Sequence, residues 1–192
     1  AGFGSIVLAA DGLLFQLQNV LSYGTDGFAN AAEALVGEAI GSKDVQALRE
    51  AVASSAKCGA WLSLAFSLIF GILGRYLLAM MTDIPEVLNV ACHYLPWLVF
   101  APQLSVWCYL LDGCFVGATL AAEMRDAMVV SAVIYAIAEP LFTGPLDLGN
   151  NGLWVSLYIF MLARAVTLAS LYNRVERLAS RQCDPAYSAL PG

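Results

Sequence analysis

Charged residues are scarce in this sequence. Only 12% of its 192 residues are Asp, Glu, Lys or Arg, about half the share found in an ordinary soluble domain. Basic residues are the scarcer kind, with nine Lys and Arg against fifteen Asp and Glu. This balance excludes a basic surface that could neutralise nucleic-acid phosphates. Nucleic acid is therefore not expected as a partner.

The sequence also lacks the residue patterns of disulfide frameworks, metal sites and common hydrolases. Its five cysteines are odd in number and form no C-x-x-C pair, and its single histidine, His93, has no second histidine as a co-ligand. Neither H-E-x-x-H nor G-x-S-x-G occurs. We therefore expect no metal, no cofactor and no enzymatic activity.

Apolar residues are abundant instead. They make up 60% of the chain, and its mean hydropathy is +0.73. A helix of about 20 apolar residues spans the hydrocarbon core of a membrane. Polar or Gly- and Pro-containing breaks divide the chain into five such helices. The sequence thus predicts an all-α polytopic membrane helix bundle, with helices over residues 4–41, 45–81, 85–119, 120–142 and 152–176 and a polar tail over 179–192.

The basic residues fall at alternate connections of these helices. One side of the bundle collects nearly all of them: Lys43, Arg49, Lys57, Arg125, Arg174, Arg177 and Arg181. The positive-inside rule predicts that this side is cytoplasmic, as is the C-terminus, in a multi-pass protein of the cell membrane. Five crossings then place residue 1 outside, and we expect a fragment that lacks at least one upstream helix.

Several ionisable residues lie within the apolar segments, where each costs a few kcal/mol unless it has a partner or a water-filled cavity. They are Asp11, Asp26, Glu33, Asp112, Glu139 and Arg164. Glu33, Asp112 and Arg164 lie at similar depth, roughly 15 Å from the basic side. We therefore expect Arg164 to pair with Asp112 or with Glu33. Such a pair is either a structural lock between helices or part of a substrate or ion pathway.

Asp26 lies deeper and has no Lys or Arg at its own depth. It is flanked by Gly24 and Gly27. A carboxylate without a cationic partner is a candidate for binding and releasing a proton. The alternative is that Asp26 accepts hydrogen bonds at a bend of the helix. Asp26, Glu33, Asp112 and Arg164 are thus the candidate residues of a substrate or ion pathway.

Small residues recur at the spacing that lets membrane helices approach closely. Gly37 and Gly41 form one G-x-x-x-G pattern, and Gly113 and Gly117 form another, directly after Asp112. We expect these glycines to lie at helix–helix contacts. The pattern occurs in membrane helices of every function.

A set of short segments, in order, resembles the multidrug and toxic compound extrusion (MATE) transporters, particularly their DinF-like branch. They include DGFANAAEALVGEAIG at 26–41, YLPW at 94–97, YLLDG at 109–113, GAT at 117–119 and GLW at 152–154. The resemblance covers residues 5 to about 178. It implies a chain of twelve helices in two six-helix lobes around a central cavity, of which this sequence supplies the eighth to twelfth.

The resemblance implies a secondary active efflux transporter. Such a protein exchanges lipophilic, often cationic compounds for protons or sodium ions by alternating access. The N-terminal lobe of the same protein would be the missing partner, and in several members of the branch that lobe holds the essential protonatable aspartate. Some relatives place a cation-binding acid on the tenth helix, but here that position aligns near Tyr109, so no sodium site is transferred. The alternative is a non-transporting half-length membrane scaffold or partner subunit.

Overall fold

The computed structural model describes residues 4–146 and 148–181. In this part of the chain it contains five α-helices and no strand: α1 (Ser5–Gly41), α2 (Val45–Met81), α3 (Pro85–Gly117), α4 (Ala121–Thr143) and α5 (Gly149–Arg181). All five helices are long and apolar enough to cross a membrane. The prediction of an all-α bundle with five membrane-spanning helices is confirmed.

Local chemistry explains where α2 begins and where α3 ends. The side chain of Asp44 caps α2 by accepting hydrogen bonds from the backbone N–H groups of Gln46 and Ala47, at 2.8 and 3.0 Å. Thr119 adopts a left-handed φ of 59°, a conformation that a helix cannot continue through. For this reason α3 ends at Gly117, two residues before its expected end.

The last helix is longer than expected. It begins at Gly149 instead of residue 152 and continues to Arg181 instead of residue 176. Residues 179–181, expected in the polar tail, therefore belong to α5. The remainder of that expected tail, 182–192, lies outside the described residues.

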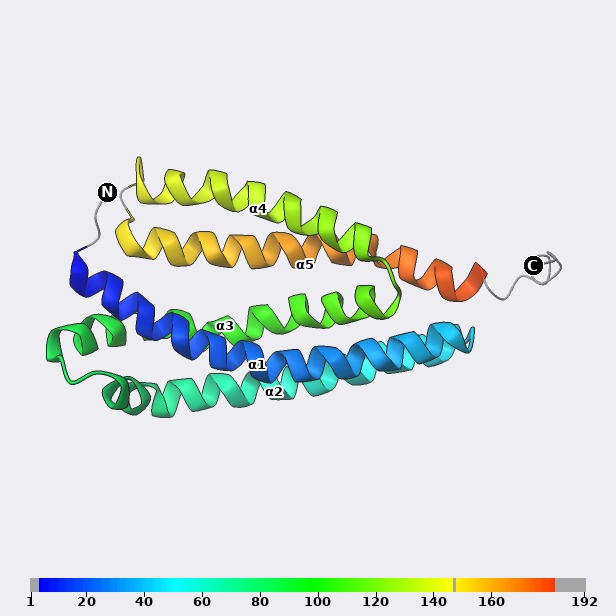
Figure 1. The fold of residues 1–192 in the computed structure, drawn as a ribbon, viewed down its shortest axis with the longest axis horizontal. Helices are drawn as coiled ribbons and strands as arrows, with labels where there is room; N and C mark the ends of the chain where they lie inside the picture. Colours follow the sequence, from blue (N-terminus) through cyan, green and yellow to red (C-terminus); the bar gives the residue numbers. More distant parts are fainter. Residues whose placement is uncertain (1–3, 147, 182–192) are drawn as a thin grey trace.

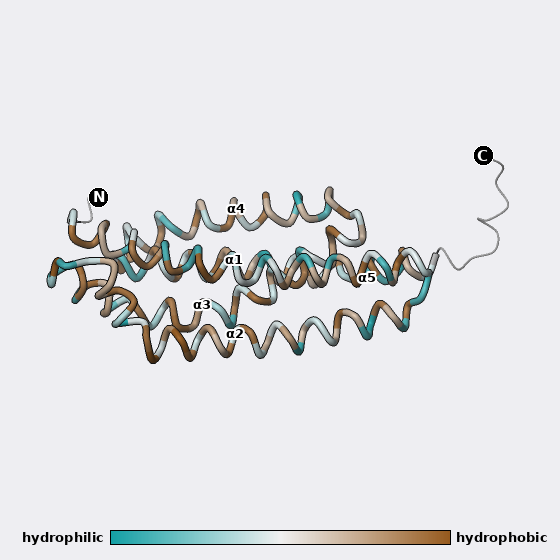
Figure 2. The backbone as a smooth tube through the Cα atoms, turned by 60° about the horizontal axis from the view of Figure 1, so that its bottom comes forward, coloured by the Kyte–Doolittle hydropathy of each residue, from teal (hydrophilic) through white to brown (hydrophobic). Residues whose placement is uncertain are grey.

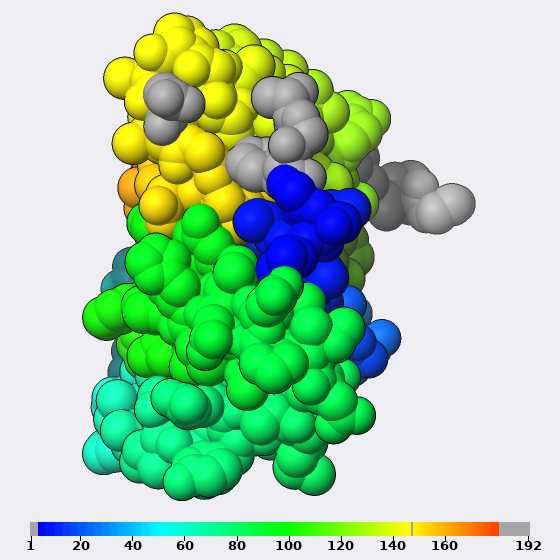
Figure 3. Space-filling view, turned by 90° about the vertical axis from the view of Figure 1, so that its left-hand side faces the viewer, coloured from blue at the N-terminus to red at the C-terminus, as the bar shows by residue number. Residues whose placement is uncertain are grey.

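The helices run back and forth along one axis (Figure 1). The α1–α2 and α3–α4 connections lie at the same end of the bundle as the end of α5. The α2–α3 and α4–α5 connections lie at the other end, where the start of α1 sits between them (Figure 3). Helix α3 is central, because it packs against each of the other four helices, while α4 packs mainly on α5.

The basic residues gather at one end, as the sequence predicts. Arg49 on α2 pairs with Glu176 on α5, and Arg174 on α5 pairs with Glu123 on α4, each at 3.0 Å. These ion pairs join three helices at the end where α1 meets α2. Which side of the membrane this end faces remains a prediction.

The core consists of two apolar clusters, one in each half of the bundle. The cluster near the basic end joins α1, α2, α3 and α5 through residues such as Val36, Leu48, Phe115 and Leu168. The other joins the same helices through residues such as Leu14, Phe70, Leu98 and Trp154.

Much of the outer surface is apolar. On α2, large hydrophobic side chains point outward along the second half of the helix, including Trp61, Leu68, Ile72 and Met80. Figure 2 shows this half of α2 as hydrophobic, whereas hydrophilic positions gather toward the end where α2 begins. An apolar surface of this extent is stable against lipid and not against water.

Candidate functional site

An ion pair joins α3 to α5 inside the bundle. An Nη2 atom of Arg164 lies 2.8 Å from an Oδ2 atom of Asp112, and the two side chains are only 15% and 14% exposed. The expected pairing of Arg164 is confirmed, with Asp112 as the partner. Among the described residues, Glu33 forms no ion pair.

The pair leaves hydrogen-bonding capacity unused. Asp112 Oδ1 and Arg164 Nε are buried and have no partner among the described residues. A two-point pairing would have satisfied both atoms. Because unsatisfied buried polar atoms are costly, this pair can gain from an additional polar group or water at the same place.

A second contact holds the two helices in register. Cys108, one turn before Asp112 on α3, donates from its Sγ to the backbone carbonyl of Met161 on α5, at 3.0 Å. Met161 precedes Arg164 on α5 by about one helical turn. The contact fixes the segment of α3 that presents Asp112 to Arg164.

Two of the four candidate glycines bring α1 and α3 close together, directly after Asp112 on α3. A Cβ atom on Gly113 would lie 2.5 Å from the carbonyl oxygen of Ala29, and one on Gly117 would lie 2.5 Å from the carbonyl oxygen of Glu33. A Cβ atom on Gly37 would make a looser contact, 3.6 Å from the carbonyl oxygen of Gly117. A Cβ atom on Gly41 would have no atom within 4 Å. Three of the four glycines thus lie at this interface, and Gly41 does not.

A polar stripe runs along the open face of α1. Its members are spaced alternately by three and four residues, which places them on one face of a helix. Five are exposed and the sixth, Glu33, is half-buried: Gln16, Asn19, Tyr23, Asp26, Asn30 and Glu33. We call this set the α1 stripe. A membrane-spanning helix cannot present such a row of polar side chains to lipid at low cost.

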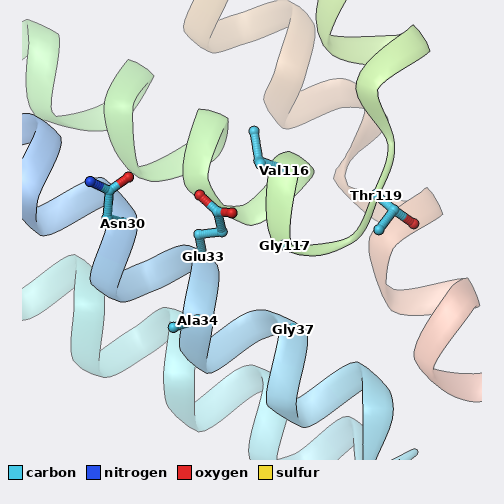
Figure 4. A pocket seen from close by; sticks show the side chains of 7 residues that line it. All are labelled: Asn30, Glu33, Ala34, Gly37, Val116, Gly117 and Thr119. Atoms are coloured by element: carbon cyan, nitrogen blue, oxygen red, sulfur yellow. The ribbon is translucent and has the colours of Figure 1, made fainter.

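One end of the α1 stripe lines a hollow of about 530 Å³ between α1 and the end of α3. Asn30 and Glu33 contribute its polar side chains from α1, and Val116 and Thr119 line it from the other side (Figure 4). The hollow is open, so a polar molecule or a polar protein surface could occupy it. Gly117 also lines the hollow, and its close contact with the Glu33 carbonyl oxygen sets the distance between α1 and α3 at this point.

Asp26 lies in the middle of the α1 stripe. It is exposed, and α1 continues unbroken through it from Ser5 to Gly41. The described part of the chain holds no hydrogen bond or ion pair to its carboxylate. The structure therefore gives no support to the expectation that Asp26 accepts hydrogen bonds at a helix bend.

Sequence reasoning missed two sets of polar residues. The first is Gln16, Asn19 and Asn30, which share the face of Asp26 and Glu33. Their regular spacing within one apolar helix is a signal that could have found them. The second is Asn150, the hydrogen-bond partner of Asp11, which comes from a distant part of the chain and left no comparable signal.

Together these features define a multi-pass membrane protein whose helices enclose charged groups and present a polar face. The family model of MatE matches residues 1–143, and the chain belongs to this family. It is 37% identical to the DNA damage-inducible protein F of Escherichia coli (strain K12) over 174 residues. It is 24% identical to the Protein DETOXIFICATION 45, chloroplastic, of Arabidopsis thaliana over 164 residues.

These matches cover most of this chain and a minor part of each relative. The chain is covered over 91% and 85% of its length, but it spans only 37% and 29% of the two relatives. Its fold is similar to that in the crystal structure of the eukaryotic MATE transporter AtDTX14, with a TM-score of 0.80 and 16% identity. That match covers 92% of this chain and 41% of the transporter chain.

Proposed function

We propose that this chain is the C-terminal lobe of a secondary active efflux transporter. The complete transporter exports lipophilic, cationic compounds and takes up protons or sodium ions by alternating access. Its second lobe packs opposite the α1 stripe, so that the stripe lines a central cavity. The lobe lies in the cell membrane with its basic end and its C-terminus in the cytoplasm.

The observation that carries this proposal is the α1 stripe itself. Polar side chains on the surface of a membrane-spanning helix face either another protein surface or a water-filled passage. In the stripe these side chains extend over Gln16 to Glu33, about 26 Å along the helix axis. That length approaches the thickness of the hydrocarbon core, which a continuous passage has to cross.

The charge of the stripe favours a cationic compound. Its two carboxylic acids are Asp26 and Glu33, and no basic side chain pairs with either in the described residues. A carboxylate in a sheltered cavity binds an organic cation or a proton, but not both at once. This competition is what couples export of one to uptake of the other.

Removing both charges of the stripe tests the proposal. In the full-length transporter, the double variant Asp26→Asn, Glu33→Gln is expected to export a lipophilic cation at least about 100-fold more slowly, since each of the two lost charge-assisted contacts is worth about 1.5–3 kcal/mol, a factor of about 10 or more. The measurement is uptake of a cationic dye into inverted membrane vesicles. Glu50→Gln is the matched control, because Glu50 is an exposed acid on α2 outside the stripe.

The result also separates the transporter from a membrane scaffold that transports nothing. If the chain is a scaffold, the unaltered protein exports no dye, and adding the dye produces no proton or sodium flux. Unchanged export by the double variant would contradict the assignment of Asp26 and Glu33 to the substrate pathway. Equal loss in the Glu50→Gln control would show that the effect is not specific to the stripe.

A further inference from the structure

A groove runs between α2 and α5 on the outer surface of the lobe. Its apolar part is an open hollow of about 530 Å³, which α3 also lines. The lining side chains in the described part of the chain are all uncharged, and they include Val52, Ala56, Leu104, Trp107, Val166 and Tyr172. Some of the large ones are exposed, such as Trp107 and Val166. This part of the groove therefore suits a hydrocarbon chain.

The groove lies on the opposite side of α3 from α1. Leu104 lines the groove, whereas Gly113 contacts α1 at the carbonyl oxygen of Ala29. The nine residues from Leu104 to Gly113 correspond to about two and a half helical turns, so the two positions face in opposite directions. The second lobe, which we place opposite the α1 stripe, therefore leaves the groove open to membrane lipid.

The length of the apolar hollow matches one leaflet of a membrane. On α5 the hollow extends from Leu162 to Tyr172, about 15 Å along the helix axis. The hydrocarbon core of a bilayer is about 30 Å thick, so each leaflet contributes about 15 Å. Tyr172 lies at the end of the hollow nearer the basic end of the lobe. A lipid of the leaflet at that end can thus place one acyl chain along the hollow.

At the basic end the groove continues into a polar hollow. On α2, Arg49 precedes Val52 by about one turn, and on α5, Glu176 follows Tyr172 by about one turn. The polar hollow has a volume of about 340 Å³ and is lined by Val45, Arg49, Asn173, Glu176, Arg177 and Ser180. The two hollows are therefore consecutive parts of one groove, apolar within the membrane and polar at its edge. A phospholipid has the same order of acyl chain and headgroup.

The polar hollow carries a net positive charge. Its two arginines, Arg49 and Arg177, are accompanied by one acid, Glu176. The ion pair of Arg49 with Glu176 uses the Nε atom of Arg49, and a guanidinium has four further N–H donors. Arg177 is exposed and forms no ion pair with the described residues, although it also borders the Arg174–Glu123 pair. Arginine binds phosphate groups well, and basic pockets between membrane helices bind anionic headgroups.

We propose that the groove binds one anionic phospholipid from the leaflet at the basic end. An acyl chain lies in the apolar hollow, and the phosphate binds Arg49 and Arg177. The lipid joins α2 to α5 along a seam that the Arg49–Glu176 ion pair already crosses, so its binding stabilises the lobe at this end. The inference goes beyond the proposed transport function, from which it takes only the position of the second lobe.

Native mass spectrometry of the full-length protein in detergent tests the proposal. The protein is titrated with anionic phosphatidylglycerol and with zwitterionic phosphatidylcholine, and the lipid-bound fraction is measured at each concentration. We expect phosphatidylglycerol to bind more tightly. Arg177→Gln is expected to weaken the binding of one phosphatidylglycerol molecule about 5-fold, the effect of one basic residue at a membrane surface, and to leave phosphatidylcholine binding unchanged. Arg125→Gln, which removes an exposed arginine outside the groove, is the matched control and keeps the affinity.

A second variant tests the apolar hollow without changing the charge. Ala169 lines this hollow and is exposed, so a phenylalanine at this position is compatible with folding and takes up space needed by the acyl chain. We expect Ala169→Phe to weaken phosphatidylglycerol binding at least about 4-fold, the effect of keeping one methylene group out of the hollow. Ala132→Phe, at an exposed position of α4, is the matched control and keeps the affinity.

Binding that neither Arg177→Gln nor Ala169→Phe weakens would overturn the proposal, as would equal affinity of the unaltered protein for the two lipids. Displacement of the lipid by an equal concentration of glycerol phosphate would make the site one for a free phosphate compound. Loss of a dimer in Ala169→Phe, with lipid binding unchanged, would show that a second copy of the chain covers the groove. Intact lipid binding by a protein that exports nothing would support this site and contradict only the proposed transport.

Discussion

Replacing Arg164 with methionine is expected to destabilise the folded lobe by about 3–5 kcal/mol. The substitution leaves the Asp112 carboxylate without its cation in a site where only 14% of its side chain is exposed. An uncompensated buried charge accounts for most of the expected loss, rather than the attraction between the two groups. The measurement is the unfolding midpoint of the full-length protein in detergent, compared with that of the unaltered protein.

The double variant Arg164→Met, Asp112→Leu is the control for this explanation. It removes both charges and replaces them with apolar side chains of similar size, so stability should return to within about 1 kcal/mol of the unaltered protein, or exceed it. A double variant as unstable as Arg164→Met alone would show that the pair makes some further contact on which the fold depends.

The same double variant separates the two roles that the pair could have. If Asp112 and Arg164 only lock α3 to α5, restored stability brings restored export. If they belong to the ion pathway, stability returns but export does not. The second outcome is favoured by the unused hydrogen-bonding atoms of the pair, Asp112 Oδ1 and Arg164 Nε, which a bound water or ion could satisfy.

Replacing Gly113 with valine is expected to destabilise the lobe by about 3 kcal/mol or more. A Cβ atom at this position would lie 2.5 Å from the backbone carbonyl oxygen of Ala29. Because that oxygen belongs to the main chain of α1, the contact cannot be relieved by a rotamer change, and the two helices have to separate. Overpacking that requires backbone movement is costly.

The matched control is Gly12→Ala, also within a helix. A Cβ atom on Gly12 would have no atom within 4 Å, so this variant is expected to be neutral or to stabilise the helix by about 0.5–1 kcal/mol. Unfolding midpoints of the two variants give the comparison. Equal stability of Gly113→Val and the unaltered protein would contradict the close approach of α1 and α3.

Part of the candidate site could be predicted from the sequence. Arg164 and Asp112 lie at similar distances from the basic ends of their helices. Helices that cross the same membrane side by side bring residues of equal depth to the same level. That argument left Asp112 and Glu33 as alternatives, since depth alone does not tell which face of a helix a side chain occupies. The structure decides for Asp112, because α3 packs between α1 and α5 at this level.

The pair Asp11 and Asn150 shows what sequence reasoning could not reach. The two residues are 139 positions apart, and nothing in the local pattern of either helix connects them. Asp11 was one of several acids in apolar segments, and Asn150 belonged to a stretch interpreted as a loop. Only the packing of α5 beside α1 places them in contact.

The sequence by itself determined the class of this protein: an all-α membrane bundle, its five helices, the clustering of its basic residues at one end and its family. These features depend on apolar length, helix breaks and charge placement, which are local properties of the chain. The tertiary structure alone decided which polar groups are paired, which lie on the open face of α1 and which are buried. Those outcomes depend on how each helix is rotated about its axis, and this rotation is set by side-chain packing between helices distant in the sequence.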